Sequence, residues 1–108
     1  MKEILLPEYI EMRKKQAEIL SEIYRNVSEL KTTPDTAKII SDFLVQIADE
    51  YDRENDVSGL LEECESINNG FKELPLPKTR EEFEDRARLF VLMRSIEDFL
   101  EIKKNMYN

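Results

Sequence analysis

The sequence contains no histidine, no tryptophan, a single cysteine and only two glycines among its 108 residues. Without histidine, a histidine general base, a Ser–His or Cys–His nucleophile and imidazole-ligated metal sites are excluded. Gly59 and Gly70 lie too far apart for a phosphate loop, which needs clustered glycines. Cys64 has no disulfide partner in the chain, and it falls in an apolar stripe, so we expect it in the core. These absences predict a protein with no enzymatic activity and no bound cofactor.

Long apolar runs are also missing. The longest spans residues 89–93 and is flanked by arginines, whereas a transmembrane helix needs ~20 apolar residues. Residues 1–7 contain an apolar stretch too short for the core of a signal peptide. The net charge of −8 repels both a phosphate backbone and an anionic membrane surface. We therefore expect a cytoplasmic protein that binds neither nucleic acid nor membranes.

Helix-forming residues and a helical apolar period dominate what is present. With 41% hydrophobic and 37% charged residues, the chain can build a modest core under a solvated surface. Apolar residues recur every three to four positions in separate segments, which is typical of amphipathic helices. The pattern predicts helices at about residues 8–31, 34–53, 57–69 and 80–104.

Local signals at the helix ends support these boundaries. Thr33 before Pro34 is a good N-cap, because its hydroxyl can accept a hydrogen bond from the first turn. Thr79 and Glu82 have the spacing of a capping box at the start of the last helix. Gly70 is expected to end the third helix, because glycine accepts the left-handed conformation that closes a helix.

The order and spacing of these helices predict the fold. Short connections favour antiparallel neighbours, and two prolines make residues 71–78 an extended connection between the third and fourth helices. The fourth helix is apolar on every side over residues 89–93, so we expect it at the centre. The prediction is an all-α, up-and-down antiparallel four-helix bundle. It forms a single domain over residues 1–108, with residues 1–6 as an amino-terminal segment.

The first helix carries an irregular apolar stripe. Arg13 and Gln16 occupy positions in this stripe where apolar residues are expected, so its first half is predicted to be less buried. The apolar members of the stripe are Tyr9, Leu20, Ile23, Val27 and Leu30.

Two acidic pairs offer the strongest candidate for metal chemistry. Glu62 and Glu65 lie in the third predicted helix, and Glu82 and Asp85 lie in the fourth. Their spacing resembles that of the all-α nucleotide pyrophosphatases, a resemblance that implies magnesium-dependent hydrolysis. The fuller Glu-Glu-x-x-Glu pattern of those enzymes is missing. Because these residues flank core positions, we expect the carboxylates to point outward.

The acidic junction at residues 49–56 resembles part of a helix–loop–helix calcium site. Asp52, Glu54 and Asp56 have the alternating spacing of oxygen ligands in such a loop. However, Val57 stands where the sharp turn of that loop needs glycine. The sequence therefore favours a solvated acidic loop, and we predict no metal ligands.

With no catalytic constellation, the sequence indicates an acidic cytosolic protein–protein interaction module: an adaptor, a regulator or an assembly subunit. One alternative is a carboxylate-based magnesium enzyme that acts on a nucleotide. Another is an acidic nucleic-acid mimic that inhibits a basic target.

Apolar residues outside the main stripes predict a partner-binding surface. Val91 and Ile102 lie about three helical turns apart and return to nearly the same side of the fourth helix. Ile39 and Met106 are candidates to extend this strip. A two-fold homodimer would bury such a strip against its own copy. The alternative is a monomer in which residues 1–6 cover the strip, and we favour the dimer.

Overall fold

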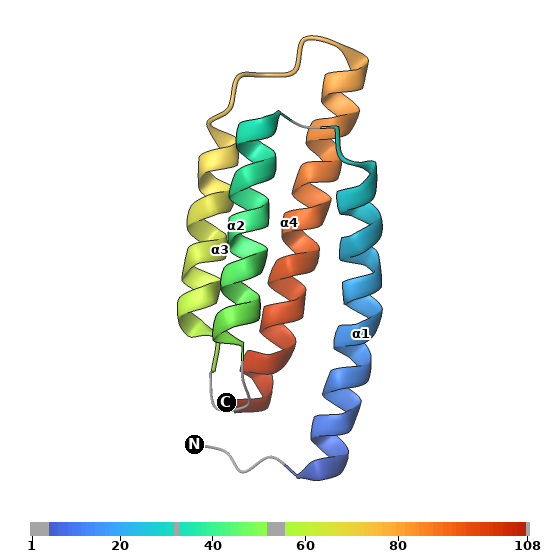
Figure 1. Ribbon diagram of the computed structural model, residues 1–108, viewed down its shortest axis with the longest axis vertical. Helices are drawn as coiled ribbons and strands as arrows, with labels where there is room; N and C mark the ends of the chain where they lie inside the picture. Colours follow the sequence, from blue (N-terminus) through green and yellow to red (C-terminus); the bar gives the residue numbers. More distant parts are fainter. Residues whose placement is uncertain (1–4, 32, 52–55, 108) are drawn as a thin grey trace.

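The computed structural model describes residues 5–31, 33–51 and 56–107, which form four α-helices. Successive helices run in opposite directions along a molecule that measures 50 × 23 × 20 Å (Figure 1). The predicted all-α, up-and-down four-helix bundle is confirmed. The helices are α1 (Leu6–Glu29), α2 (Pro34–Glu50), α3 (Ser58–Lys72) and α4 (Arg80–Tyr107).

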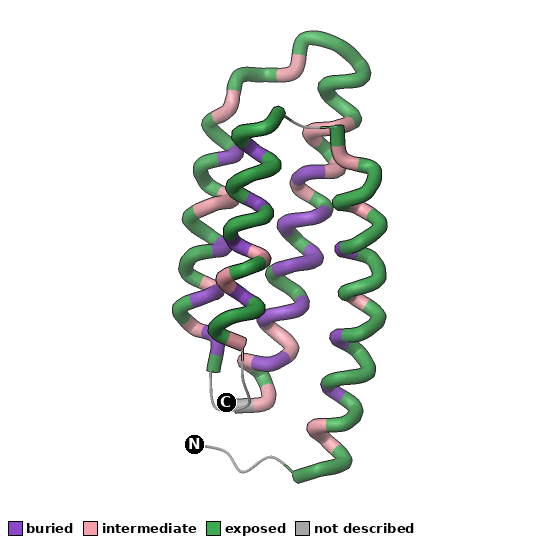
Figure 2. Tube along the Cα trace, in the orientation of Figure 1, coloured by how far each residue is buried: buried purple, intermediate pink, exposed green. Residues whose placement is uncertain are grey.

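The last helix, α4, forms the centre of the bundle. It packs against α1 and against α3, and buried residues recur along most of its length (Figure 2). Leu92 and Leu100 are fully buried, as expected for a helix whose apolar residues spread over more than one face. The buried side of α2 joins the same core through Ile40, Phe43 and Ile47.

The helix starts follow the capping chemistry of the sequence. The Thr33 hydroxyl accepts a hydrogen bond from the backbone N–H of Thr36 at 3.3 Å, so the predicted cap of α2 is confirmed. At the start of α4, the Thr79 hydroxyl accepts from the N–H of Glu82 at 3.0 Å. The Glu82 carboxylate accepts from the N–H of Lys78 at 2.7 Å instead of that of Thr79, so only half of the predicted capping box forms.

The predicted end of α3 at Gly70 is wrong. The helix continues through Gly70 to Lys72, and neither glycine has a positive φ. Phe71 is buried in the core, so packing of the next side chain favours helix beyond the glycine. The extended connection begins only after this turn and contains Pro75 and Pro77.

The predicted inward stripe of α1 is partly wrong. Met12, Gln16 and Ile23 are the buried residues of this helix, so its first half is packed against the core. Leu20 and Val27, placed in the core by the sequence pattern, are 48% and 40% exposed. The helix has a second apolar stripe about 95° around from the buried one. The second stripe faces the groove described next.

Candidate functional site

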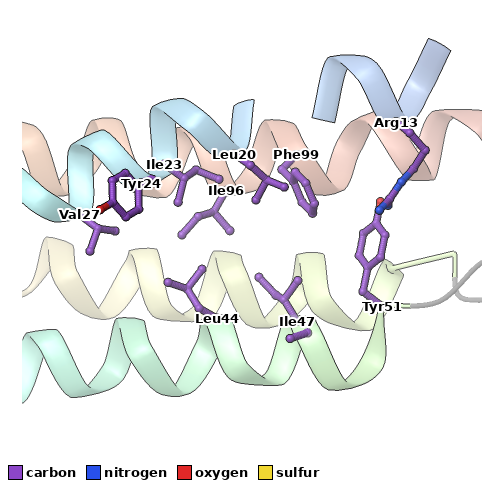
Figure 3. A pocket seen from close by; sticks show the side chains of 11 residues that line it. Arg13, Leu20, Ile23, Tyr24, Val27, Leu44, Ile47, Tyr51, Ile96 and Phe99 are labelled. Atoms are coloured by element: carbon purple, nitrogen blue, oxygen red, sulfur yellow. The ribbon is translucent and has the colours of Figure 1, made fainter. Parts of the chain in front are cut away.

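An apolar groove of about 480 Å³ lies between α1 and α2 (Figure 3). Leu20 and Tyr24 of α1 form one wall, and Leu44 of α2 forms the other. Ile96 and Phe99 of α4 line it between these walls. Such a concave apolar surface on a helical bundle is suited to receive apolar side chains.

The groove continues toward the carboxyl end of α1 and the amino end of α2. A second hollow of about 430 Å³ lies there, lined by Leu30 of α1 and by Ala37 and Ser41 of α2. Val27, Leu44 and Ala48 line both hollows, so the two are continuous. An apolar channel therefore follows the facing sides of α1 and α2 over several helical turns.

Both walls have the residue spacing of a helix-packing surface. Along each helix the spacing alternates between three and four residues, which keeps successive side chains on one side. We call these surfaces the α1 seam and the α2 seam. The α1 seam consists of Leu6, Ile10, Arg13, Ala17, Leu20, Tyr24 and Val27, all exposed. The α2 seam consists of Ala37, Ser41, Leu44, Ala48 and the C-cap residue Tyr51, all exposed or half-buried.

Hydrogen bonds close one end of the groove. The buried Gln16 side chain donates from Nε2 to the Tyr51 hydroxyl and, at 3.1 Å, to the backbone carbonyl of Phe99. Its Oε1 accepts from Nη1 of Arg13, also at 3.1 Å. Gln16 thereby links α1 to α4 and to the end of α2. A buried amide is stable only when its donors and acceptors are paired, and here three partners supply this pairing.

Two cations lie near the Tyr51 ring at this end. Arg13 Cζ lies 5.6 Å from the ring centroid, and the buried Lys103 Nζ lies 4.2 Å from it. Such contacts are favourable because the ring face is electron-rich. Burial raises the pKa of the Tyr51 hydroxyl, against the opposing effects of the Gln16 hydrogen bond and the Arg13 charge. Tyr51 therefore stays neutral near pH 7, and Arg13 is the charged residue in the lining of the groove.

The four predicted partner-binding residues do not form one surface. Val91 is 53% exposed and Ile39 is 44% exposed, whereas Ile102 and Met106 are half-buried. Ile39 lies in the second turn of α2 and Met106 in the last turn of α4, and both helices run in the same direction (Figure 1). These two residues therefore lie at opposite ends of the bundle. None of the four residues lines the groove.

The structure also locates the predicted carboxylates. Glu62 and Glu65 are exposed, as expected. Asp85 accepts from the backbone N–H of Lys31 at 2.6 Å, so it ties the α1–α2 connection to α4. Among the described residues, no group of carboxylates and cysteine converges as metal ligands would. Asp52 and Glu54 of the acidic junction lie outside the described residues.

Cys64 lies in the core, as the apolar stripe predicted. Its side chain is buried, and burial raises the pKa of the thiol to about 12, with a smaller contribution from the charge of Glu97. A thiol with so high a pKa is protonated near pH 7 and is a poor nucleophile.

The groove and its polar end were not predicted from the sequence. The signal was present in α1, where Arg13 and Gln16 interrupt the stripe. We interpreted both as signs of weak burial, yet Gln16 is 1% exposed. The second signal was the alternating spacing of exposed apolar residues, which belongs to a second seam. A search for two adjacent stripes on one helix would have found it.

The four helices and the apolar groove between α1 and α2 define a helical-bundle domain, and comparison with known proteins gives its family. The family model described as "Putative aromatic acid exporter C-terminal domain" matches residues 3–104. The chain belongs to this family. It is 37% identical over 95 residues to "Uncharacterized protein YqjA" of Bacillus subtilis (strain 168), which covers 88% of this chain and 30% of YqjA. No solved structure matches the chain.

This family membership corrects two predictions from the sequence. The predicted cytosolic adaptor, with its nucleotide-enzyme and nucleic-acid-mimic alternatives, is wrong, because the family is that of the C-terminal domains of exporters. The predicted cytoplasmic location is wrong for the same reason, because an exporter works in a membrane. Within the described residues, no helix combines the length and apolar character needed to cross a bilayer. The charged residues and short apolar runs of the chain are typical of a water-exposed helical bundle, so they did not point to this family.

Proposed function

We propose that this chain is the C-terminal domain of a membrane protein that exports aromatic acids. The family match over residues 3–104 carries the proposal. The matched region makes up 30% of YqjA. A protein of that length has most of its residues outside this domain, and in our proposal those residues form the membrane part of the exporter. The bundle supports a role beside the transport path, because its apolar side chains pack mainly against one another and 37% of its residues are charged.

The groove between α1 and α2 is the surface through which the domain takes part in the exporter. Its walls are exposed and apolar, with Tyr24 exposed by 76%. Exposed apolar surface of this extent is costly in water unless another surface covers it. The alternating spacing of the seams matches the side chains of a packed α-helix. In this proposal, a helix within the exporter assembly covers the groove.

Efflux measurements test the proposed export activity. The protein with this domain attached is expressed in cells preloaded with radiolabelled benzoate, and retained label is followed over time. We expect faster loss of benzoate than from cells carrying the empty vector. Cyclohexanecarboxylate, which has the carboxylate without the aromatic ring, is the matched control and should leave more slowly. Equal benzoate loss with and without the protein contradicts the proposal.

A truncated protein tests the role of the domain. Removal of residues 6–107 should lower benzoate efflux while the rest of the protein is still found in the membrane fraction by immunoblot. If the truncated protein is present at the normal level and exports benzoate at the normal rate, the domain has no part in export.

A further inference from the structure

We infer that the groove between α1 and α2 is also a ligand site, which takes an elongated aromatic carboxylate with its charged group at Arg13 and its rings along the apolar floor. The inference rests on the proposed function in one respect, because the acid occupies the groove in place of the covering helix. Acid and helix exclude each other, so the domain responds to the acid through this site. The site is separate from the path by which an acid is exported.

The lining of the groove combines one cation with apolar surface. Among the described residues of this lining, Arg13 carries the charge, and the rest are aliphatic or aromatic side chains. Arg13 lies at the same end of the groove as Tyr51 (Figure 3). Ligand sites of this kind are mainly apolar, with a few polar groups that fix the orientation of the ligand. A ligand that fills the groove therefore gains from a carboxylate at the Arg13 end and from apolar groups along the rest.

Contacts within the bundle hold the Arg13 guanidinium in position. Its Nη1 donates to Oε1 of Gln16 at 3.1 Å, and its Cζ lies 5.6 Å from the centroid of the Tyr51 ring. Gln16 accepts from one of the five N–H groups of the guanidinium, and the Arg13 side chain is exposed. A planar guanidinium binds a carboxylate through two parallel hydrogen bonds. Because Arg13 is already oriented, it loses little further freedom when it binds one.

The surface beside Arg13 is aromatic. Tyr51 and Phe99 line this part of the groove, with ring centroids 5.3 Å apart and ring planes inclined by 39°. Aromatic rings pack favourably on one another in tilted or offset arrangements. A ring that carries the carboxylate bound to Arg13 can make such contacts with both residues. This end of the groove therefore favours an aromatic acid over an aliphatic one.

The groove is longer than a single ring. Its lining follows α1 from Arg13 to Val27, a length of about 20 Å along a helix. Its volume of about 480 Å³ is typical of small-molecule sites. Beyond the aromatic end, the lining consists of aliphatic side chains that include Leu20, Leu44 and Ile96 (Figure 3). A second ring linked to the first lies against these side chains, so the groove favours an acid with two linked rings.

The net charge of −8 does not exclude such a ligand. At physiological salt, exposed charges more than about 8 Å from a ligand are largely screened. Arg13 acts at contact distance, where screening is weak. The affinity for a carboxylate should therefore depend on Arg13 and not on the net charge of the chain.

Titration of the 108-residue chain with biphenyl-4-carboxylate, followed by NMR, tests the site. We expect saturable shifts of the methyl signals of Leu20, Leu44 and Ile96, with a Kd of about 0.1–1 mM for a ligand of this size. The signals of Val91, which lies outside the groove, should not move. Benzoate should bind about tenfold more weakly, because it lacks the second ring. Biphenyl-4-carboxamide, which has the same shape without the charge, should also bind about tenfold more weakly.

Substitution of Arg13 tests the position of the carboxylate. Arg13→Met removes the charge and keeps most of the side-chain length. It should weaken binding of biphenyl-4-carboxylate about tenfold and leave the affinity for the carboxamide unchanged, because only the acid pairs with the guanidinium. Arg25→Met is the matched control, since it makes the same change in net charge at an exposed residue outside the groove. It should leave both affinities unchanged. Circular dichroism shows whether both variants remain folded, and the comparison of acid with carboxamide on the original chain needs neither variant.

Several outcomes overturn the inference. One is the absence of saturable shifts at any soluble concentration of biphenyl-4-carboxylate. Others are equal affinities for acid and carboxamide, or an equal loss of affinity in Arg13→Met and Arg25→Met. Tighter binding of decanoate would assign the groove to a fatty acid. A dimer in sedimentation equilibrium that Leu20→Glu breaks would assign it to a second copy of the chain.

The results also separate this inference from the proposed function. If the chain binds no acid while the protein that carries it exports benzoate, the ligand site is refuted and the exporter proposal stands. If the chain binds biphenyl-4-carboxylate at Arg13 while the protein exports no benzoate, the exporter proposal is refuted and the ligand site stands.

Discussion

At the scale of single residues, Gln16 joins α1 to α4 and to the end of α2 at one end of the groove. It is a buried polar residue in a stripe of otherwise mainly apolar contacts, and it bonds to side chain and backbone on different helices. Tyr51 completes the arrangement, since its ring contacts both Arg13 and Lys103 while its hydroxyl accepts from Gln16. The position of α1 relative to α2, and with it the width of the groove, depends on these few contacts.

Replacing Gln16 tests this arrangement. We expect Gln16→Ala to lower the free energy of unfolding by about 2 kcal/mol, because it leaves buried partners unpaired and removes packed atoms. Tyr51→Phe, which removes only the hydroxyl, should cost about 1 kcal/mol. Urea denaturation followed by circular dichroism measures both. A loss below ~0.5 kcal/mol for Gln16→Ala would mean that Gln16 is not the buried link between the helices.

Cys64 gives a second prediction at this scale. The folded pKa of the thiol is about 12, against an ordinary value of 9.0. A folded pKa above the unfolded one means that the neutral thiol stabilises the folded state, fully below about pH 9. This contribution is lost as the pH rises from about 9 to 12. We therefore expect stability to fall in that range, and less steeply in Cys64→Ala.

The same burial predicts slow chemical labelling of Cys64. A thiol reagent at pH 8 should modify the folded chain only as fast as it unfolds, and should react at once in denaturant. Rapid labelling of the folded chain would contradict the buried position of Cys64 on α3.

At the scale of helices, the features that were predicted correctly are those that depend on side chains close by in the sequence. The cap at Thr33, the start of α4 at Thr79 and the central place of α4 all followed from side chains near the feature itself. The end of α3 did not, because burial of Phe71 depends on neighbours distant in sequence. The groove was missed for a related reason. A helix with two adjacent apolar stripes, as in α1, does not reveal from its own sequence which stripe meets α4 and which stays open.

Gly70 tests the end of α3. It lies within the helix without a positive φ, and a Cβ added there meets no atom within 4 Å. Gly70→Ala should therefore stabilise the chain by about 0.5–1 kcal/mol, since alanine favours helix and reduces the freedom of the unfolded chain. Thermal unfolding measures this change. If Gly70 instead closed the helix in a left-handed conformation, the same substitution would destabilise the chain.

At the scale of the whole molecule, the fold leaves one long apolar face uncovered. The centre of the bundle is filled by α4, which packs against α1 and α3. On the open side, α1 and α2 present their seams to the outside with a groove between them (Figure 3). Membership in the exporter family gives this face a context, because a domain joined to a larger protein has surfaces that only the assembly covers. We propose that export depends on this face.

Benzoate efflux from cells that express the protein with single substitutions in this domain tests that claim most directly. Leu20→Glu places a charge in the groove, and Phe83→Glu places one at an exposed site on α4 that does not line the groove. Both proteins should reach the membrane at equal levels by immunoblot. We predict that Leu20→Glu lowers efflux toward that of the empty vector while Phe83→Glu leaves it unchanged. Equal efflux by the two variants would contradict it.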